Sequence, residues 1–375
     1  MPSRSLAQLW DWDALFSGIG ALPFGGGRYL LGSFLNFLDH ATSEGHVPGC
    51  LTPKGPSSTL AHAKPVVIQG ALLGARAVGA VQELRAHQPK MRALLSFWDR
   101  ERLDPASGLY VWHDQMESGA DDLPYAEVPS KHTPEWREEL HARTLSSPDL
   151  AVFLHREHAA YASCLGAWAE AEPQGEARAA LEAEAAQHTA KAADVAQRAA
   201  ARLWHDAGGG RGWWAGFNTR TQTLIPTRTY QMAWPLWVPG MGSPEQRACA
   251  LAAVLEPDMR APAGIRSTSS LDARFELADA IIPYSIWRGP VWLNVNMVLC
   301  YSLMACGAGA EARRLGSDLV RVLALDLRTS GAWHECYHPD TGAPLSKESK
   351  GFLSWTVMAA DLLANVEAGV DPTRI

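Results

Sequence analysis

The chain has 375 residues and a formal net charge of −7, from 33 basic and 40 acidic residues. Because it contains no run of about five like charges, we expect neither nucleic acid nor an anionic membrane as a partner. The six cysteines lack a C-x-x-C spacing, and residues 1–13 lack a basic start followed by an apolar run, so we expect a cytoplasmic protein with reduced thiols and no bound metal or cofactor.

Helical periodicity of the apolar residues dominates the chain, and strand signals are sparse. The stretches predicted as helices are Asp13–Leu22, Tyr29–His40, Ala63–Leu84, Gln88–Arg102, Asp149–Glu172, Gly175–Leu203, Gln231–Val238, Gln246–Leu255, Val291–Cys306, Glu311–Leu327 and Phe352–Val366. These helices predict an all-α fold close to a barrel of six helical hairpins. We expect one barrel domain over residues 1–375, either complete or lacking a first helix.

Long connections rich in Gly, Pro and Trp separate the pairs of helices. They are Asp104–Thr133, Trp204–Thr229, Glu256–Ile286 and Thr329–Lys350. Long structured loops usually carry function, and this spacing indicates that the loops converge on one mouth of the barrel.

Tryptophan is unusually frequent, at 15 of the 375 residues. Indole rings pack on the C–H faces of sugars and also donate a hydrogen bond, so a pocket lined by tryptophan suits carbohydrate. The alternative is that these side chains fill a large helical core.

The segment Trp10-Asp11-Trp12-Asp13 alternates indoles with carboxylates just before a helix. An aspartate in this place usually serves as the helix N-cap, which is one interpretation of Asp11 or Asp13. The other interpretation is a sugar platform with a carboxylate that binds hydroxyl groups.

A second segment, Tyr110–Pro124, places four acidic residues within nine positions. A solvated acidic loop would explain them. A neighbouring carboxylate or an apolar wall also raises the pKa of a carboxyl group, as a catalytic acid requires, and Asp121-Asp122 beside a glycine turn fits that alternative. The residues alone do not choose between Asp121 and Asp122.

Two later segments combine aromatic and charged residues. In Tyr284–Asn296, Arg288 lies between two tryptophans ahead of a helix expected to start at or just after Pro290, where a guanidinium is unfavourable unless it binds an anion. In Trp333–Gly342, His334 and His338 have the spacing of a helical metal pair. Pro339 and Gly342 instead favour a turn.

Taken together, these segments resemble glycoside hydrolase family 63, in particular its mannosylglycerate and glucosylglycerate hydrolases, and more faintly the family 37 trehalases. The resemblance extends from Trp10 to about Leu363. The matching stretches are Trp10–Phe16, Lys64–Gln69, Glu117–Asp121, Trp287–Asn296, Glu335–Gly342 and Phe352–Thr356. They follow the family's order, and the WRGP-x-W piece is the most specific.

The resemblance implies an (α/α)6 barrel and inversion at the anomeric carbon. It assigns Asp121 as the general acid and Glu335 as the general base, with no metal. The residues it implies as walls of the sugar subsite are Trp12, Asp13, Gln69, Trp112, Arg288, Gly289, Trp292 and Trp355. Family members commonly have Asn-Ser-Pro after the acid, whereas this chain has Asp122-Leu123-Pro124.

Three functional hypotheses remain open at this point. The first is hydrolysis of a small α-glycoside, α-mannosylglycerate or α-glucosylglycerate first, with Lys64, Arg266 or Arg288 receiving the glycerate carboxylate. The second is an α-glucosidase for a neutral di- or oligosaccharide. The third is a sugar-binding barrel that has lost turnover.

Overall fold

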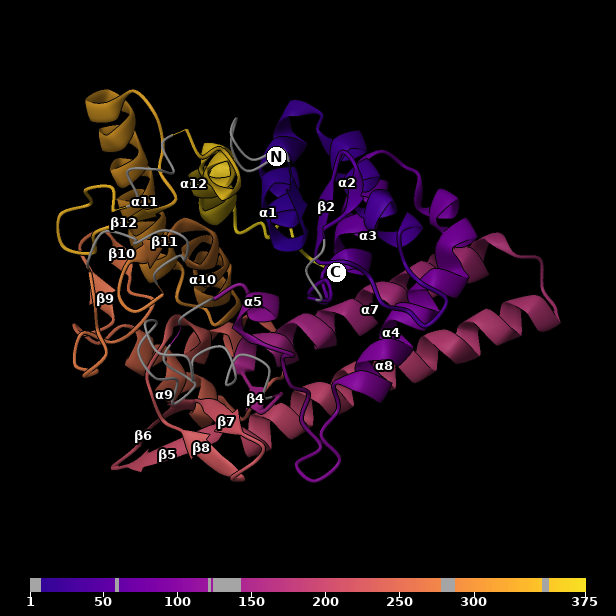
Figure 1. The fold of residues 1–375 in the computed structure, drawn as a ribbon, viewed down its shortest axis with the longest axis horizontal. Coiled ribbons are helices and arrows are strands. Elements are labelled where there is room, and N and C mark those ends of the chain that lie inside the picture. The colour runs from indigo at the N-terminus through magenta and orange to yellow at the C-terminus, as the bar shows by residue number, and fades with distance from the viewer. Residues whose placement is uncertain (1–7, 58–60, 121–122, 124–142, 278–286, 346–350) are drawn as a thin grey trace.

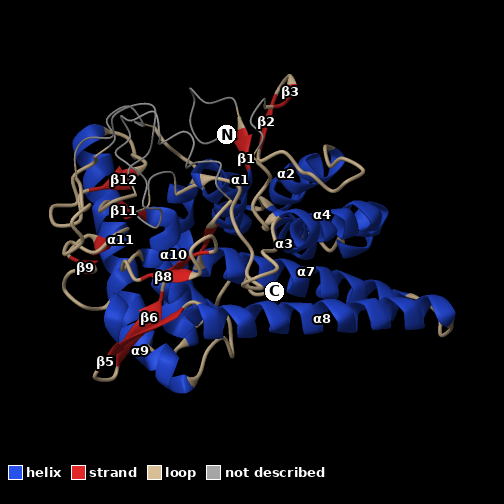
Figure 2. Ribbon diagram, turned by 60° about the horizontal axis from the view of Figure 1, so that its bottom comes forward, coloured by secondary structure: helices blue, strands red, loops and turns tan. Residues whose placement is uncertain are grey.

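The computed structural model describes residues 8–57, 61–120, 123, 143–277, 287–345 and 351–375, and helices predominate in them (Figures 1 and 2). The α-helices are α1 (Asp11–Ala21), α2 (Gly27–Asp39), α3 (Val67–Ala77), α4 (Gln88–Glu101), α5 (Gln115–Ser118), α7 (Pro148–Ala171), α8 (Glu176–Arg202), α9 (Pro244–Val254), α10 (Leu293–Ala305), α11 (Gly309–Ser330) and α12 (Ala359–Ala368). Shorter 3-10 helices are η1 (Leu22–Phe24), η2 (Val81–His87), η3 (Tyr230–Trp237) and η5 (Trp355–Met358).

The helices predicted from periodicity are confirmed to within a few residues at most ends, with four corrections. The stretch expected as one helix over residues 352–366 is the 3-10 helix η5 followed by α12, which begins at Ala359. The single helix expected over residues 63–84 is two elements, α3 and η2, separated by a turn in which Gly79 has a φ of 69°. The segment 231–238 is a 3-10 helix with Pro235 inside it, and in an α-helix the proline ring would clash with the carbonyl four residues earlier. The helix expected at Pro290 begins at Leu293, after a short strand.

The strands in the described residues are short; β1 precedes α1, and the others lie in the connections between helices. They are β1 (Leu9–Trp10), β2 (Cys50–Thr52), β3 (Gly55–Pro56), β4 (Leu145–Ser146), β5 (Trp204–Gly208), β6 (Arg211–Trp214), β7 (Gly216–Asn218), β8 (Thr223–Ile225), β9 (Arg260–Ala261), β10 (Gly264–Ile265), β11 (Val291–Trp292) and β12 (Cys336–Tyr337). They form antiparallel ribbons, in the orders β1-β2-β3, β4-β7-β8, β5-β6, β10-β9 and β11-β12.

Successive helices pack in pairs, namely α2 with α3, α7 with α8, and α10 with α11. Figures 1 and 2 show α7 and α8 running side by side as the longest pair. Every residue of α10 from Leu293 to Leu303 is buried, whereas α8 and α11 bury only one stripe. A helix buried on all sides belongs to an inner layer, and a helix with one apolar stripe belongs to an outer layer.

Glu157 of α7 holds the start of α3. Its carboxylate accepts the amides of Ile68 at 2.7 Å and Gln69 at 3.1 Å, which are unpaired donors of the first helical turn. Burial raises the pKa of Glu157 to about 7. These hydrogen bonds join α7 to the start of α3, within the Lys64–Gln69 stretch.

None of the helices in the described part of the chain is long and apolar enough to span a bilayer.

Candidate active site

Four tryptophans from three distant segments form one cluster, which we call the tryptophan cluster: Trp12, Trp287, Trp292 and Trp355. Trp287 stacks on Trp292 with centroids 4.1 Å apart and ring planes 5° from parallel. Trp12 lies 5.7 Å from Trp287 and 6.3 Å from Trp355, measured between centroids. All four are at most 5% exposed. Trp12, Trp292 and Trp355, predicted from separate segments, are thus brought together.

Glu335, the predicted base, lies at the edge of this cluster. Strand β12 pairs with β11, with Trp292 opposite Cys336, so the residue after Glu335 is fixed beside the cluster. The indole Nε1 of Trp355 donates to the backbone carbonyl of Glu335 at 3.4 Å. The Glu335 side chain is half-buried.

The loop that leads to the predicted acid is tied down by Glu117. This carboxylate is buried, and it accepts Arg102 Nη2 at 2.8 Å, Arg102 Nε at 3.2 Å and the amide of His62 at 3.1 Å. The amide of His113 also donates to it at 2.5 Å. Glu117 is therefore a structural anchor, and the interpretation of the loop as solvated acidic surface is wrong for this residue.

Two residues after this anchor, the chain touches the tryptophan cluster. Gly119 has a φ of 76°, and a Cβ there would lie 2.7 Å from both Trp12 Cζ2 and Lys64 Cε. Asp121 and Asp122 lie outside the described residues, so the choice between them stays a prediction. The described part of the loop therefore approaches Trp12, and Trp355 of the same cluster contacts the backbone of Glu335.

The first segment contributes a buried ion pair and a carboxyl group. Lys64 Nζ lies 3.1 Å from Asp11 Oδ1 and 4.7 Å from the Trp12 ring centroid. Asp13 accepts a hydrogen bond from Ser354 Oγ at 2.8 Å. Burial and the charge of Asp11 raise the pKa of Asp13 to about 6, against the lowering effect of that hydrogen bond. The N-cap expectation is wrong for both aspartates, because Trp10 occupies the cap position and they follow it in the first turn.

Two of the side chains predicted to contact the sugar form hydrogen bonds within the protein. The Gln69 amide donates to the carbonyls of Pro65 and Phe153 at 2.6 Å and 3.1 Å and accepts Arg156 Nε at 3.0 Å. Trp112, 1% exposed, donates from Nε1 to Ser147 Oγ at 2.8 Å. These contacts place both side chains within the wall of the barrel.

The three basic residues predicted as candidates to bind the glycerate carboxylate differ in their surroundings. Lys64 is committed to Asp11, and Arg266 donates to Asp340 at 2.6 Å and to the carbonyl of Pro257 at 3.0 Å. Arg288 is half-buried beside the tryptophan cluster, and its neighbour Gly289 is buried.

Sequence reasoning missed Arg143, an exposed residue whose Nε donates to His113 Nδ1 at 3.0 Å. Burial lowers the pKa of His113, which favours the neutral ring, and the hydrogen bond from Arg143 assigns Nδ1 as its unprotonated nitrogen. A positive φ of 46° is rare outside glycine and often marks a functional position, but nothing in the sequence signals it at Arg143.

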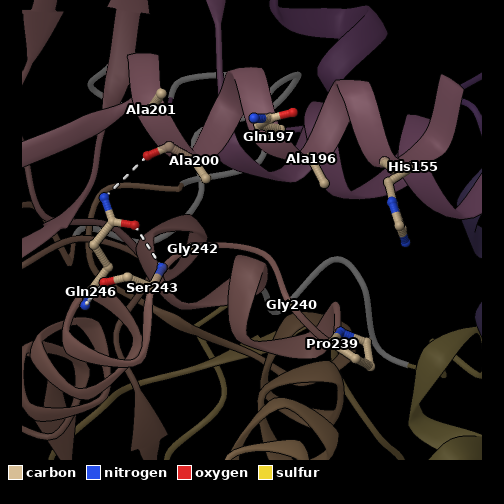
Figure 3. Close-up of a pocket in the computed structure, with 11 residues that line it drawn as sticks. His155, Ala196, Gln197, Ala200, Ala201, Pro239, Gly240, Gly242, Ser243 and Gln246 are labelled. Atoms are coloured by element: carbon tan, nitrogen blue, oxygen red, sulfur yellow. Dashed lines mark hydrogen bonds between the residues drawn. The ribbon is translucent and has the colours of Figure 1, made fainter. Parts of the chain in front are cut away.

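A cavity of about 460 Å³ lies elsewhere, between the α7–α8 pair and the start of α9 (Figure 3). Its walls include His155, Gln197, Pro239, Ser243 and Gln246. None of the predicted site residues that the structure describes lines it. The Gln246 side chain is already used in a capping box with Ser243, which starts α9.

The sequence of the chain matches a family model and a curated relative. Residues 7–356 match the family model described as the mannosylglycerate hydrolase MGH1-like glycoside hydrolase domain. A curated relative, a probable mannosyl-oligosaccharide glucosidase from Schizosaccharomyces pombe, is 28% identical over 119 residues, which are 29% of this chain and 14% of that protein.

Solved structures agree over nearly the whole chain. A family 63 mannosylglycerate hydrolase from Thermus thermophilus in complex with glucose is 22% identical, with a TM-score of 0.70, over 97% of this chain and 95% of that one. A neutral trehalase from Saccharomyces cerevisiae is 16% identical, with a TM-score of 0.72, over 99% of this chain and 75% of that one. These likenesses confirm the (α/α)6 barrel predicted from the sequence.

Proposed function

The chain belongs to the mannosylglycerate hydrolase MGH1-like family of glycoside hydrolases, and we propose that it hydrolyses a small α-glycoside with inversion. The preferred substrates are α-mannosylglycerate and α-glucosylglycerate, cleaved to free sugar and glycerate. The observation that carries the proposal is that the described residues that precede Asp121 and the segment of Glu335 both contact the tryptophan cluster, through Gly119 on Trp12 and through Trp355 on Glu335.

In this proposal, Glu335 removes a proton from a water molecule while the oxygen of that water bonds to the anomeric carbon. The glycosidic C–O bond breaks at the same time, and Asp121 gives its proton to the departing glycerate oxygen. Water enters from the face opposite the leaving group, so an α-glycoside yields a β-sugar. This geometry requires the two carboxyl groups to be roughly 6.5–9.5 Å apart.

The sugar ring would lie against Trp12, Trp292 and Trp355, whose apolar faces suit its C–H groups. Asp13, held by Ser354, would accept hydrogen bonds from sugar hydroxyls. The contacts of Gln69 and Trp112 instead support roles in holding the wall behind these residues.

The glycerate carboxylate needs a cation at the mouth. Lys64 and Arg266 are already bound to carboxylates. Arg288 is half-buried beside the tryptophan cluster, and we add Arg143 as a further candidate. The guanidinium of Arg143 is fixed through Nε by His113 and is exposed, so its terminal N–H groups can meet an anion.

Product analysis tests the proposal. The protein would be incubated with α-mannosylglycerate, α-glucosylglycerate, trehalose and a neutral α-glucobiose, and the anomer first released would be read by proton NMR. We expect glycerate conjugates to be cleaved fastest and to release the β-anomer of the sugar first. An initial α-anomer from a glycerate conjugate would contradict inversion, and binding of sugar without any product would support the impaired barrel instead.

A second candidate is an α-glucosidase for neutral saccharides. It is favoured by the partial match to the fission-yeast glucosidase and by the fold shared with the yeast trehalase. Cleavage of neutral disaccharides with no reaction on glycerate conjugates would select it. Arg143→Gln separates the two candidates further, since it should raise KM only for an anionic substrate.

A further inference from the structure

A buried carboxylate on α11 organises the segment that carries Glu335. Asp326 Oδ2 accepts hydrogen bonds from His334 Nδ1 and from the Tyr337 hydroxyl, both at 2.8 Å. Asp326 Oδ1 accepts Ser330 Oγ, also at 2.8 Å. Asp326 is 1% exposed and His334 is 4% exposed. Because a carboxylate only accepts hydrogen bonds, this contact places a proton on Nδ1 of His334.

The two partners on Oδ2 lie on either side of Glu335 in the chain. The Tyr337 hydroxyl also accepts the backbone amide of His334 at 3.0 Å, which closes a ring of contacts over residues 334–337. On the other side, β11 holds Cys336 and Tyr337 by strand pairing. The backbone of Glu335 is thus fixed from α11 and from β11 together.

We propose that Asp326 is a positioning residue that sets the orientation of Glu335 for attack by water, acting through His334 and Tyr337. This inference rests on the proposed function, in which Glu335 is the base. A general base must hold its carboxylate within about 0.5 Å of the productive geometry, and such precision requires neighbours that are themselves locked by hydrogen bonds.

The chemistry of the cluster explains why an acid occupies this position. Three donors converge on Asp326, so an amide there would turn its NH2 group toward at least one of them. Burial raises the pKa of Tyr337, which keeps its hydroxyl protonated as a donor. A charged acceptor also makes stronger hydrogen bonds than a neutral one.

The first test is Asp326→Asn, assayed with the glycoside that the wild-type protein cleaves best. We expect kcat to fall about 10- to 100-fold, in line with the loss of outer-shell partners at other sites, while KM and the calorimetric Kd for the free sugar stay the same. A merely structural role would lower Tm and leave kcat unchanged at temperatures where the variant is folded. The matched control is Asp318→Asn, on the same helix, whose carboxylate binds Arg260 and Arg321 and not the Glu335 segment.

The second test keeps the inference open to refutation should Asp326→Asn not fold. His334→Asn places an amide N–H near the position of Nδ1 and should retain most of kcat, whereas His334→Leu should lose as much as Asp326→Asn. Equal kcat values for wild type, His334→Leu and any folded Asp326→Asn would overturn the positioning role while leaving the proposed function intact. A wild-type protein that hydrolyses no glycoside would overturn both.

Discussion

The indole of Trp355 donates from Nε1 to the backbone carbonyl of Glu335, at 3.4 Å. The same indole packs edge-on against Trp292, with centroids 6.0 Å apart, and against Trp12. One side chain therefore meets the proposed sugar platform and the backbone of the proposed base. The position of the base is coupled to the platform through this contact.

Replacing Trp355 by Phe should expose this coupling. The ring face is kept, the donor is lost, and a net hydrogen bond of about 1 kcal/mol corresponds to a loss of about fivefold in kcat/KM. Steady-state kinetics would measure it. The control is Trp168→Phe on α7, which removes an equivalent indole hydrogen bond to the carbonyl of Val81 in η2. Equal losses in the two variants would argue against a specific role for Trp355.

Glu117 and Arg102 form the buried ion pair that anchors the loop leading to the proposed acid, with side chains 0% and 4% exposed. Glu117→Gln leaves the guanidinium buried without its counter-charge, and breaking a buried pair in this way costs about 3–5 kcal/mol of unfolding free energy. Urea denaturation would measure the loss.

The comparison for this prediction is Glu101→Gln, since Glu101 pairs with Arg100 at the surface. Exposed pairs contribute at most about 1 kcal/mol. If the two substitutions destabilise the protein equally, Glu117 is not the anchor of the loop.

Asp13 should make sugar binding depend on pH. Its carboxyl must be ionised to accept sugar hydroxyls at both oxygens, and its pKa is raised from 3.8 to about 6. Binding should therefore weaken as the pH falls through about 6. In Asp13→Asn the Kd should be larger at neutral pH but nearly independent of pH in this range. Calorimetric titration with the free sugar at several pH values would test both statements, and a wild-type Kd that does not change would refute the first.

The fold and the site were predictable from the sequence to different degrees. The long helices could be predicted because a helix that buries one face has apolar residues at regular spacing in the sequence, as in α11. The ribbon β11–β12 could not, because two-residue strands have no period of their own, and it is this ribbon that brings Trp292 beside Cys336. The roles of Glu117 and Asp326 could not be predicted either, because the sequence does not distinguish a buried carboxylate with protein partners from an exposed one.

A pair of histidines on the α7–α8 pair should make folding stability depend on pH. His158 and His188 face each other with their Nδ1 atoms 3.0 Å apart, and their rings are stacked. Burial first, and then the charge of His188, lowers the pKa of His158 from 6.5 to about 3. The unfolded chain thus binds one more proton between these values. The other groups acting on His158 are Asp99, Lys191 and His155.

Because the unfolded state takes up that proton, stability should be complete above about pH 6.5 and fall by about 1.4 kcal/mol per pH unit below it, for this group alone. His158→Gln should remove that part of the slope. Urea denaturation between about pH 7 and pH 4 would measure it, with His40→Gln, an exposed histidine, as the control. A slope unchanged in His158→Gln would show that other groups carry the dependence.

Gly119 and Gly79 offer a matched pair for the approach of the acid loop to the tryptophan cluster. Both have a positive φ, 76° and 69°, but a Cβ on Gly119 would meet Trp12 and Lys64, whereas one on Gly79 would meet nothing within 4 Å. Alanine at either position should cost about 1 kcal/mol or more of stability from backbone strain. Only Gly119→Ala must also move the loop, and a displacement of about 1 Å at a catalytic group can reduce the rate about 100-fold. Measured kcat should therefore fall for Gly119→Ala and stay near wild type for Gly79→Ala. If kcat falls equally in both variants, the close approach of Gly119 to Trp12 does not position the proposed acid.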